Sequence, residues 1–166
     1  MIARLDLRAR IGLVFALAAL VIGAALASEI FAGLTPCALC LKQRVPYYLA
    51  LPLLGLAYFY APFGKLASRG LLVTVGVVFL VGAGLGAYHA GIEYGFWAGP
   101  ATCGGGGAMA SSPQALLLAL ESQTLVRCDA PAWTLFGISL AGYNALASLA
   151  LAALCLGALR HPEEEK

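Results

Sequence analysis

Four long stretches without acidic or basic residues constrain the fold of this chain more than any other feature. They cover Ile11–Ser28, Val45–Gly64, Gly70–Gly91 and Ala130–Leu159. Each reaches the roughly 18 residues that are typical of a transmembrane helix. A chain of 166 residues that is 61% hydrophobic and 11% charged cannot cover a soluble domain with polar side chains. We therefore expect an all-α membrane protein, a bundle of four transmembrane helices.

The charge-free stretches predict a single membrane domain over residues 1–166, with spans at approximately 11–31, 43–62, 70–90 and 133–158. Two loops on one side then cover about 32–42 and 91–132. The last stretch is 30 residues long, so we expect its first residues at the interface, ahead of a tilted span. Within the longer loop, Ser112 and Pro113 predict a helix start, and Gln114–Ser122 a short helix on the membrane surface.

Basic residues indicate the orientation. Seven of the ten lie on the ends and the loop that share one side: Arg4, Arg8, Arg10, Lys65, Arg69, Arg160 and Lys166. The positive-inside rule makes this side cytoplasmic, with both termini. In a bacterium the protein would lie in the inner membrane, with its other two loops in the oxidising periplasm, where disulfides persist. The net charge of +2 includes no basic run that would indicate nucleic-acid binding.

Four of the five cysteines fall in the two periplasmic loops: Cys37, Cys40, Cys103 and Cys128. The first two form a C-x-x-C motif, which serves zinc sites as well as redox sites. The preceding Pro36 predicts a turn, with Cys40 at the start of the second helix. Arg44, four residues further, shares a helix face with Cys40, and its guanidinium favours the thiolate that attacks a disulfide. Alone, Arg44 also fits a side chain that merely reaches the lipid headgroups.

The second pair, Cys103 and Cys128, brackets 24 residues and admits several interpretations. A static disulfide closing this loop would contribute about 3.5 kcal/mol to stability. Against this, the glycines at 104–107 predict a flexible segment, which suits a cysteine that meets different partners. Zinc bound by all four cysteines is a further alternative, although structural zinc sites more often use two short-spaced pairs. Cys155, deep in the last span, is expected to pack in the core.

His89 and Glu93 lie four residues apart at the outer end of the third span. A histidine at such a boundary is more often a hydrogen-bonded packing residue than a catalyst. Here it is also placed to share the layer of Cys40 and Arg44, where a redox cofactor would need a proton donor. His89 is therefore a secondary candidate for the site.

Together these motifs resemble the disulfide bond formation protein B (DsbB) family, from the first span to the last. The resemblance rests on four segments: Thr35–Arg44, Gly86–Glu93, Gly99–Cys103 and Cys128–Trp133. The loop between the last two cysteines, with its glycine run, looks like a compact variant of the family.

The resemblance implies a quinone reductase that reoxidises DsbA, a periplasmic thioredoxin-fold dithiol oxidase, and so sustains disulfide bond formation. It implies that Cys103 forms the mixed disulfide with this partner and that Cys128 is its resolving mate. Electrons would then pass to the pair Cys37 and Cys40.

The resemblance also implies a quinone acceptor, ubiquinone or menaquinone, and no metal. Cys40 would pass electrons to the quinone, Arg44 would polarise a quinone carbonyl, and His89 is a second candidate for a quinone contact. Three alternatives remain open: an enzyme resembling vitamin K epoxide reductase, a chaperone-like or structural membrane protein with inert disulfides, and a metal-binding or transport protein. The position of the C-x-x-C after the first span favours the DsbB family over the first of these.

Overall fold

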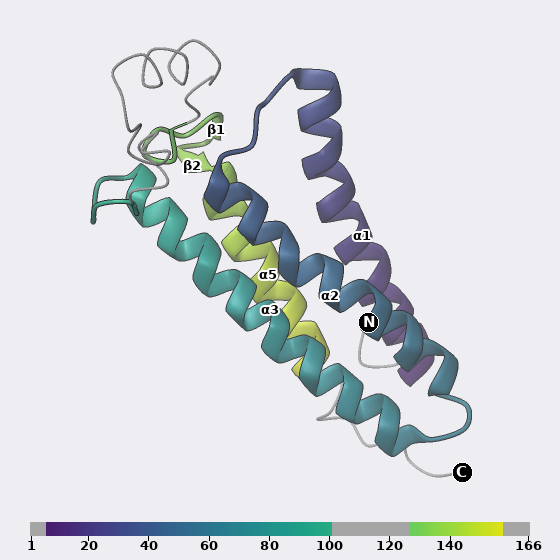
Figure 1. The fold of residues 1–166 in the computed structure, drawn as a ribbon. Coiled ribbons are helices and arrows are strands. Elements are labelled where there is room, and N and C mark those ends of the chain that lie inside the picture. The colour runs from purple at the N-terminus through teal and green to yellow at the C-terminus, as the bar shows by residue number, and fades with distance from the viewer. Residues whose placement is uncertain (1–5, 101–126, 158–166) are drawn as a thin grey trace, which may run out of the picture.

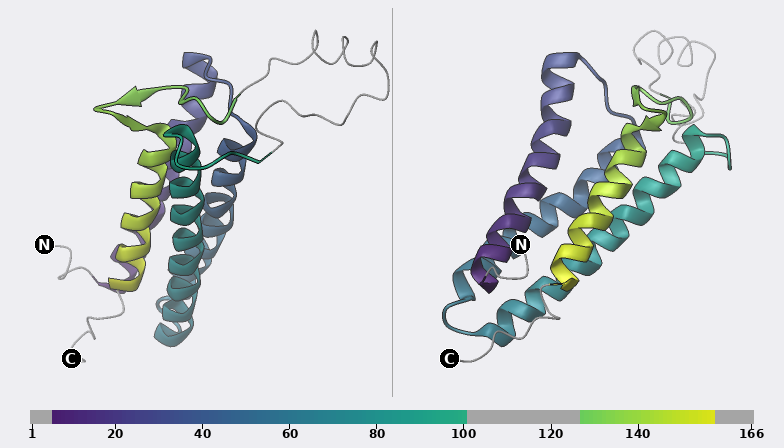
Figure 2. Two further views of the ribbon diagram at one scale, coloured as in Figure 1. Left: turned by 90° about the vertical axis from the view of Figure 1, so that its left-hand side faces the viewer. Right: turned by 180° about the vertical axis from the view of Figure 1, so that it is seen from behind.

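The computed structural model describes residues 6–100 and 127–157 and forms a helical bundle, as the sequence predicts (Figure 1). Its elements are α1 (Leu7–Ala32), α2 (Ala38–Tyr60), α3 (Lys65–Glu93), β1 (Thr134–Leu135), β2 (Ile138–Ser139) and α5 (Leu140–Gly157). The start of α1, the turn from α2 to α3 and the end of α5 lie at one end, which we name the inner end (Figure 2). The start of α2 and the strands lie at the opposite, outer end. The expected surface helix Gln114–Ser122 and the glycines at 104–107 lie outside the described residues.

Small residues let the helices approach closely. Helix α3 packs against α5 and α2, and α1 packs against α2 and α5. At Gly86, a Cβ atom would lie 2.8 Å from the backbone nitrogen of Ala145, so only glycine fits where α3 meets α5. Gly82, one turn earlier, lies against Pro46 of α2 and Ser148 of α5. The G-x-x-x-G pair in the third stretch therefore packs against neighbouring helices, as small residues in membrane helices do.

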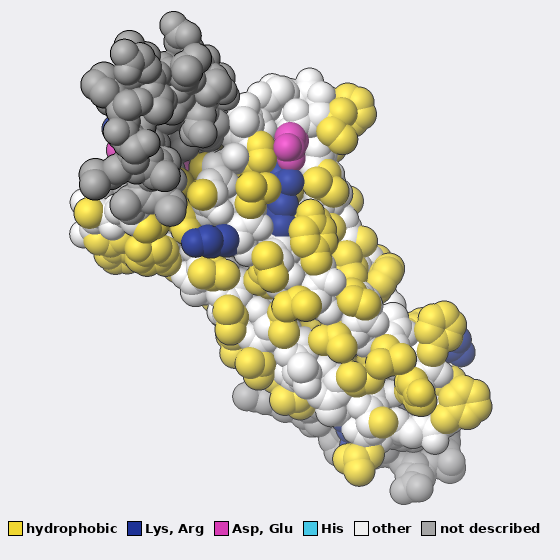
Figure 3. Space-filling model, in the orientation of Figure 1, with side chains coloured by type: hydrophobic (Ala, Val, Ile, Leu, Met, Phe, Trp, Pro, Cys, Tyr) yellow, Lys and Arg dark blue, Asp and Glu magenta, His cyan; other side chains and the backbone are white. Residues whose placement is uncertain are grey.

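The helices bury an apolar interior and turn apolar side chains outward as well. Buried residues include Leu54, Leu72 and Val75, and the Tyr47 and Phe79 rings meet edge to face at 5.5 Å. Large exposed hydrophobic side chains run along the helices, and charged side chains are sparse on the face in Figure 3. An exterior of this kind suits lipid rather than water.

Three helices of the described residues are long and apolar enough to cross a membrane: Leu7–Ala32, Leu66–Glu93 and Leu140–Gly157. Helix α2 has 23 residues but carries Lys42 and Arg44 near its start, so its apolar part is shorter. The membrane span at 43–62 stays a prediction.

The segment ahead of α5 differs from the sequence prediction. A helix was expected from residue 133, but Thr134–Ser139 forms a β-hairpin and α5 begins at Leu140. Its turn residues, Phe136 and Gly137, have φ values of 49° and 77°, as the tight turn of a two-residue hairpin requires. Strands of two residues are too short to show the alternation of apolar and polar residues that predicts a strand. The sequence therefore showed only that the segment is apolar, which fits a helix equally well.

A tyrosine at the end of α3 holds this hairpin against the bundle. The Tyr94 hydroxyl donates a hydrogen bond to the carbonyl of Gly137 at 2.8 Å and accepts one from the Ser139 N–H at 2.9 Å. The Ser139 hydroxyl then accepts from the Gly142 N–H at 3.1 Å, which satisfies a free backbone donor at the start of α5. The hairpin thus fixes the outer ends of α3 and α5 relative to each other.

Candidate active site at the outer end of the bundle

Cys37 caps the N-terminus of α2. Its backbone is extended (φ −76°, ψ 171°) and the helix begins at Ala38. The Cys37 Sγ accepts a hydrogen bond from the backbone N–H of Cys40 at 3.2 Å, as the oxygen of an ordinary N-cap side chain does. The partial positive charge at a helix N-terminus favours a thiolate in this position. The prediction that Cys40 sits in the first turn of the second helix is confirmed.

The two sulfur atoms of the C-x-x-C motif lie 3.0 Å apart, are hydrogen-bonded to each other and are both free thiols. The hydrogen bond with Cys40 is the largest influence on the pKa of Cys37; burial opposes it, and a hydrogen bond with His89 adds to it. The net effect lowers the pKa of Cys37 from 9.0 to about 4. The same contact with Cys37, together with burial, raises the pKa of Cys40. The stabilised thiolate is therefore Cys37, whereas the sequence had pointed to Cys40 beside Arg44.

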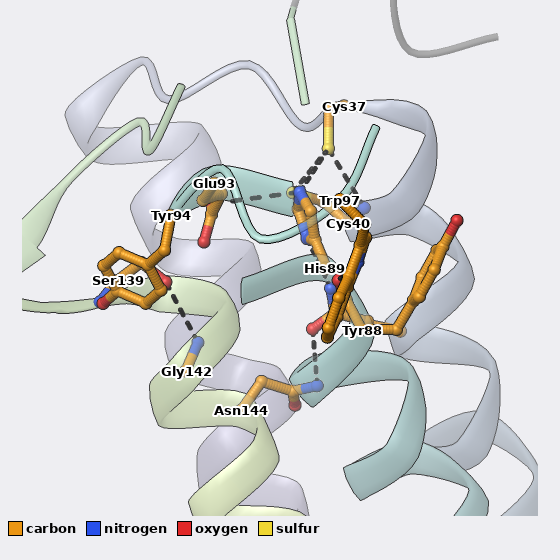
Figure 4. A network of polar contacts seen from close by, with 11 residues as sticks. Cys37, Cys40, Tyr88, His89, Glu93, Tyr94, Trp97, Ser139, Gly142 and Asn144 are labelled. Carbon is orange, nitrogen blue, oxygen red and sulfur yellow. Dashed lines mark hydrogen bonds and ion pairs between the residues drawn. The ribbon is translucent and has the colours of Figure 1, made fainter. Parts of the chain in front are cut away.

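His89 reaches this sulfur from the end of α3 (Figure 4). Its Nε2 lies 3.6 Å from the Cys37 Sγ and 3.9 Å from a carboxyl oxygen of Glu93, one turn further along the helix. Only 1% of the His89 side chain and 5% of the Glu93 side chain are exposed, so the contact is shielded from solvent. His89 thus lies beside the reactive sulfur, a neighbour that its spacing from Glu93 alone did not reveal.

Cys128 brings the outer loop to the same point. It is buried and disulfide-bonded, and its Sγ, the Cys37 Sγ and a ring nitrogen of His89 all lie within 4.8 Å of one another. Cys103 lies outside the described residues. Three such donors are close enough to hold a metal ion, but a disulfide leaves Cys128 without the thiolate that zinc binds. In this state the cluster is arranged for exchange between sulfur atoms.

Comparison with known proteins agrees with this chemistry. The family model described as "Disulfide bond formation protein DsbB" matches residues 7–158. The chain belongs to the DsbB family. It is therefore a multi-pass membrane protein with a role in disulfide bond formation, which confirms the resemblance seen in the sequence. A relative in Rickettsia prowazekii (strain Madrid E), the uncharacterized protein RP370, is 28% identical over 137 residues, or 80% of this chain and 76% of the relative. No solved structure matches the chain.

Arg44 of this DsbB-family chain has a partner at the end of α1. Its guanidinium lies 2.8 Å from a carboxyl oxygen of Glu29, and 13% of the Arg44 side chain is exposed. Leu41 and Val45, its neighbours on α2, are about half exposed. Arg44 is therefore a positive group held in place by a carboxylate and flanked by apolar surface.

Sequence reasoning missed a set of buried and half-buried polar residues beneath the cysteines. Gln43 and Tyr47 of α2 and Asn144 and Ser148 of α5 are hydrogen-bonded to one another in the bundle interior. A signal was present, because the two residues of each helix are four apart and so share a face, and polar residues inside membrane helices generally face other helices. The hydrogen bond between Gln43 and Asn144 joins residues that are 101 positions apart, so spacing along the sequence does not predict it.

An exposed ion pair flanks Cys128 in this DsbB-family protein. Arg127 donates two hydrogen bonds to the carboxylate of Asp129, at 2.8 and 2.6 Å. This contact lowers the pKa of Asp129 and raises the pKa of Arg127. At the other end of the bundle Cys155 is a free, fully buried cysteine in the apolar core, as the sequence predicted.

Proposed function

We propose that this protein is a disulfide:quinone oxidoreductase. It would oxidise a reduced DsbA-like protein of thioredoxin fold and pass the two electrons through two cysteine pairs to a membrane quinone. The observation that carries the proposal is the contact between the buried Cys37 thiol and the disulfide-bonded Cys128, whose sulfur atoms lie within 4.8 Å. A thiolate this close to a disulfide sulfur needs only a small approach to form the bond of about 2.05 Å.

The first half of the proposed reaction transfers the partner's electrons into the protein. A partner thiolate attacks Cys103 in a Cys103–Cys128 disulfide, which forms a mixed disulfide and releases the Cys128 thiolate. Cys128 attacks Cys37 in a Cys37–Cys40 disulfide, which forms a Cys37–Cys128 bond and releases Cys40. The partner's second thiol resolves the mixed disulfide, so the partner leaves oxidised and Cys103 is left reduced.

The second half returns the protein to its starting state. Cys103 attacks Cys128, which restores the outer disulfide and leaves Cys37 and Cys40 as a dithiol. Free Cys37 and Cys40 beside a disulfide-bonded Cys128 are the cysteine states in the structure. Loss of two electrons and two protons then closes the Cys37–Cys40 disulfide. A bound quinone would supply this oxidation by becoming a quinol.

The residues around Cys40 fit a quinone. Cys40 is only partly buried, and Arg44 one turn below it is a fixed cation. Exposed apolar side chains next to Arg44, including Leu41 and Val45, suit a ring and a lipid-soluble tail. We assign to Arg44 a hydrogen bond to a quinone carbonyl, with Glu29 holding the guanidinium. When Cys37 is bonded to Cys128, Cys40 no longer donates to a Cys37 thiolate, so the main cause of its raised pKa is removed.

The proposed orientation puts the cysteines in the periplasm of a bacterium, with both ends of the chain in the cytoplasm. Its support is the sequence, in which seven of the ten Lys and Arg residues fall on the ends and the loop that share one side of the predicted spans. Labelling of single introduced cysteines with a membrane-impermeant thiol reagent in intact cells tests it. Labelling at the α2–α3 turn from outside would contradict the proposal.

The decisive experiment measures anaerobic quinone reduction by the purified protein with a reduced thioredoxin-fold dithiol donor. We expect Cys40→Ser to abolish quinone reduction and to accumulate a Cys37–Cys128 disulfide, detectable by mass spectrometry of proteolytic fragments. Cys155→Ala is the matched control and should retain turnover. Normal quinone reduction by the Cys40 variant would disprove the proposed electron path.

Arg44→Ala tests the assignment of the quinone contact. We expect the KM for quinone to rise roughly tenfold, the scale of one lost charge-assisted hydrogen bond of about 1.5 kcal/mol, with a smaller change in kcat. Tyr48→Phe, a change on the exposed side of the same helix, serves as the control. An unchanged KM for Arg44→Ala would remove Arg44 from the quinone site.

A further inference from the structure

A continuous line of buried and part-buried hydrogen bonds runs from His89 into the bundle. The Gln43 Nε2 lies 2.6 Å from the His89 Nδ1, and the Asn144 Nδ2 donates to the Gln43 Oε1 at 2.7 Å. The Tyr47 hydroxyl donates to the Asn144 Oδ1 at 2.9 Å and lies 2.9 Å from the Ser148 Oγ. We name His89, Gln43, Asn144 and Tyr47 the amide chain. Figure 4 shows Asn144 of α5 below His89 of α3.

Each member of the amide chain determines the direction of the next hydrogen bond. Asn144 uses its oxygen to accept from Tyr47, so its nitrogen faces Gln43. Gln43 accepts that bond with its oxygen, so its own nitrogen, which can only donate, faces the His89 Nδ1. At 2.6 Å this Nδ1 has to accept and therefore carries no proton. The single ring proton of neutral His89 then sits on Nε2, the nitrogen that faces Cys37.

We infer that Gln43, Asn144 and Tyr47 are positioning residues that hold His89 in its Nε2–H form, so that this N–H is directed at the sulfur of Cys37. The assignment of the ring proton stands independently of the proposed electron path. Its consequence, a fixed donor beside the thiolate during exchange, rests on that proposed function.

The amide chain opposes a second proton on His89. The groups that face the ring from the packed elements are the Cys37 thiol at the start of α2, the Glu93 carboxyl group on α3, and Cys128 ahead of the hairpin, through both its sulfur and its backbone. A Cys37 thiolate and the Glu93 carboxyl group both favour a cationic ring. A proton on Nδ1 would, however, point at the NH₂ group of Gln43.

To admit a second proton, the amide chain would have to reverse. Gln43 and Asn144 would both turn over, and Tyr47 would switch from donating to Asn144 to accepting from it. Its hydroxyl could then donate to Ser148, which lies 2.9 Å away. Because three groups must change together inside the bundle, the Nε2–H form resists the charges around it.

Nitrogen-15 NMR of histidine-labelled protein tests the inference directly. The chain contains two histidines, His89 and His161, and a His161→Gln variant assigns the remaining signal to His89. With Cys37 and Cys40 reduced and at neutral pH, we expect a proton on Nε2 and none on Nδ1. A proton on Nδ1, alone or together with one on Nε2, would overturn the inference.

Two variants that introduce a carboxylate should reverse the hydrogen bonds of the amide chain in different ways. In Gln43→Glu the carboxylate can only accept, so the His89 Nδ1 should become protonated. In Asn144→Asp the carboxylate accepts from Gln43, which turns the Gln43 oxygen toward His89 and should again move a proton to Nδ1. Ser148→Ala leaves the donating bond of Tyr47 in place and should keep the Nε2–H signal. If a folded Gln43→Glu or Asn144→Asp protein keeps an unprotonated Nδ1, the chain does not set the tautomer.

The measurement needs neither quinone nor a dithiol partner. A protein that shows the Nε2–H form but does not reduce quinone would disprove the proposed function and leave this inference intact. A protein that reduces quinone but carries a proton on the His89 Nδ1 would disprove this inference and leave the proposed function intact.

Discussion

The outer and inner halves of the bundle are built from the same four helices but differ in what they bury. The outer half buries polar side chains, including Gln43 and His89, and links them by hydrogen bonds. The inner half buries mainly apolar side chains such as Leu54 and Val75, with Arg10 and Ser68 as its buried polar residues in the described part of the chain. Each half contains a buried free cysteine, Cys37 outside and Cys155 inside.

The comparison of Cys37 with Cys155 shows that burial alone does not make a cysteine reactive. Cys37 has a helix N-terminus, a neighbouring thiol and a histidine around its sulfur. Cys155 is surrounded by the apolar core cluster. A cysteine needs donors and positive potential for thiolate chemistry, and burial without them produces an inert packing residue. The proposed chemistry therefore belongs to the outer half of the bundle, and the inner half contributes mainly helix packing.

Replacing each of the two cysteines in turn is the strongest test of this difference between the halves. We expect Cys37→Ser to lower the rate of quinone reduction by on the order of 10³-fold or more, the scale seen when a nucleophile is removed. Cys155→Ala should leave the rate close to that of the unaltered protein. Steady-state turnover with a reduced thioredoxin-fold donor measures both. Comparable losses in the two variants would show that the halves do not differ in chemistry.

Replacing single glycines by alanine and measuring stability tests how closely the helices approach each other at each position. Gly86→Ala places a Cβ 2.8 Å from the backbone of Ala145, so α3 and α5 must separate, and we expect a loss of about 1–3 kcal/mol in stability. Gly84→Ala, the matched control, meets nothing within 4 Å. It should lose nothing and can gain up to about 1 kcal/mol from helix propensity.

Gly76→Ala, in the inner half, should fall between these two variants. Its nearest neighbour is the flexible side chain of Leu156, at 3.1 Å, which can move aside. Thermal unfolding in detergent, followed by circular dichroism, gives the order. A Gly86→Ala protein as stable as the Gly84→Ala protein would contradict the close α3–α5 contact.

Only 4% of the Cys37 side chain is exposed, so its reaction with a small alkylating reagent should be slow, but the pH dependence of the rate reports its thiolate. With its pKa lowered from 9.0 to about 4, the pH dependence of alkylation should be nearly flat between about pH 5 and 8. Removing Cys40, the largest cause of the shift, should raise the midpoint more than His89→Ala does. A midpoint near the ordinary thiol value in the unaltered protein would contradict the N-cap geometry.

The same shift links pH to the stability of the reduced protein. Because the pKa of Cys37 is lower in the folded protein than in the unfolded chain, its contribution is complete above about pH 9. It is lost as the pH falls toward about 4. Between about pH 9 and 4 the reduced protein should therefore lose more stability in thermal unfolding than a Cys37→Ser variant does over the same range.

The smallest effect is expected at the exposed Arg127–Asp129 pair. Solvent and salt screen exposed ion pairs, so Asp129→Asn should change stability little, and any change should shrink at high salt. Unfolding measured at low and high ionic strength checks this. A loss as large as that of Gly86→Ala would mean that the ion pair holds the segment at Cys128 in place.

The sequence was sufficient for the bundle because lipid-facing helices need long charge-free stretches, and those can be counted. It also indicated the start of α2, since proline before the C-x-x-C limits where a helix can begin. The β-hairpin was missed because its paired strands are too short for a pattern.

The contacts of the site depend on packing between distant segments. Cys37 and His89 lie 52 residues apart, and Arg44 pairs with Glu29 across the first loop. Spacing along one helix placed Arg44 with Cys40, but the carboxylate that holds Arg44 comes from α1. Such pairings follow from how the helices are oriented around each other, which one sequence does not encode in any local pattern.

The burial of Cys37 and Cys128 has a consequence for the wider chemistry of the cell envelope. Their side chains are 4% and 1% exposed, so small thiols in the surrounding solution have little access to the junction between them. Burial therefore protects these two sulfur atoms from reduction by other thiols. Under the proposed function, electrons that enter the junction come through the protein's own cysteines, so the identity of the reduced partner, rather than the thiol content of the medium, would control the rate of electron transfer.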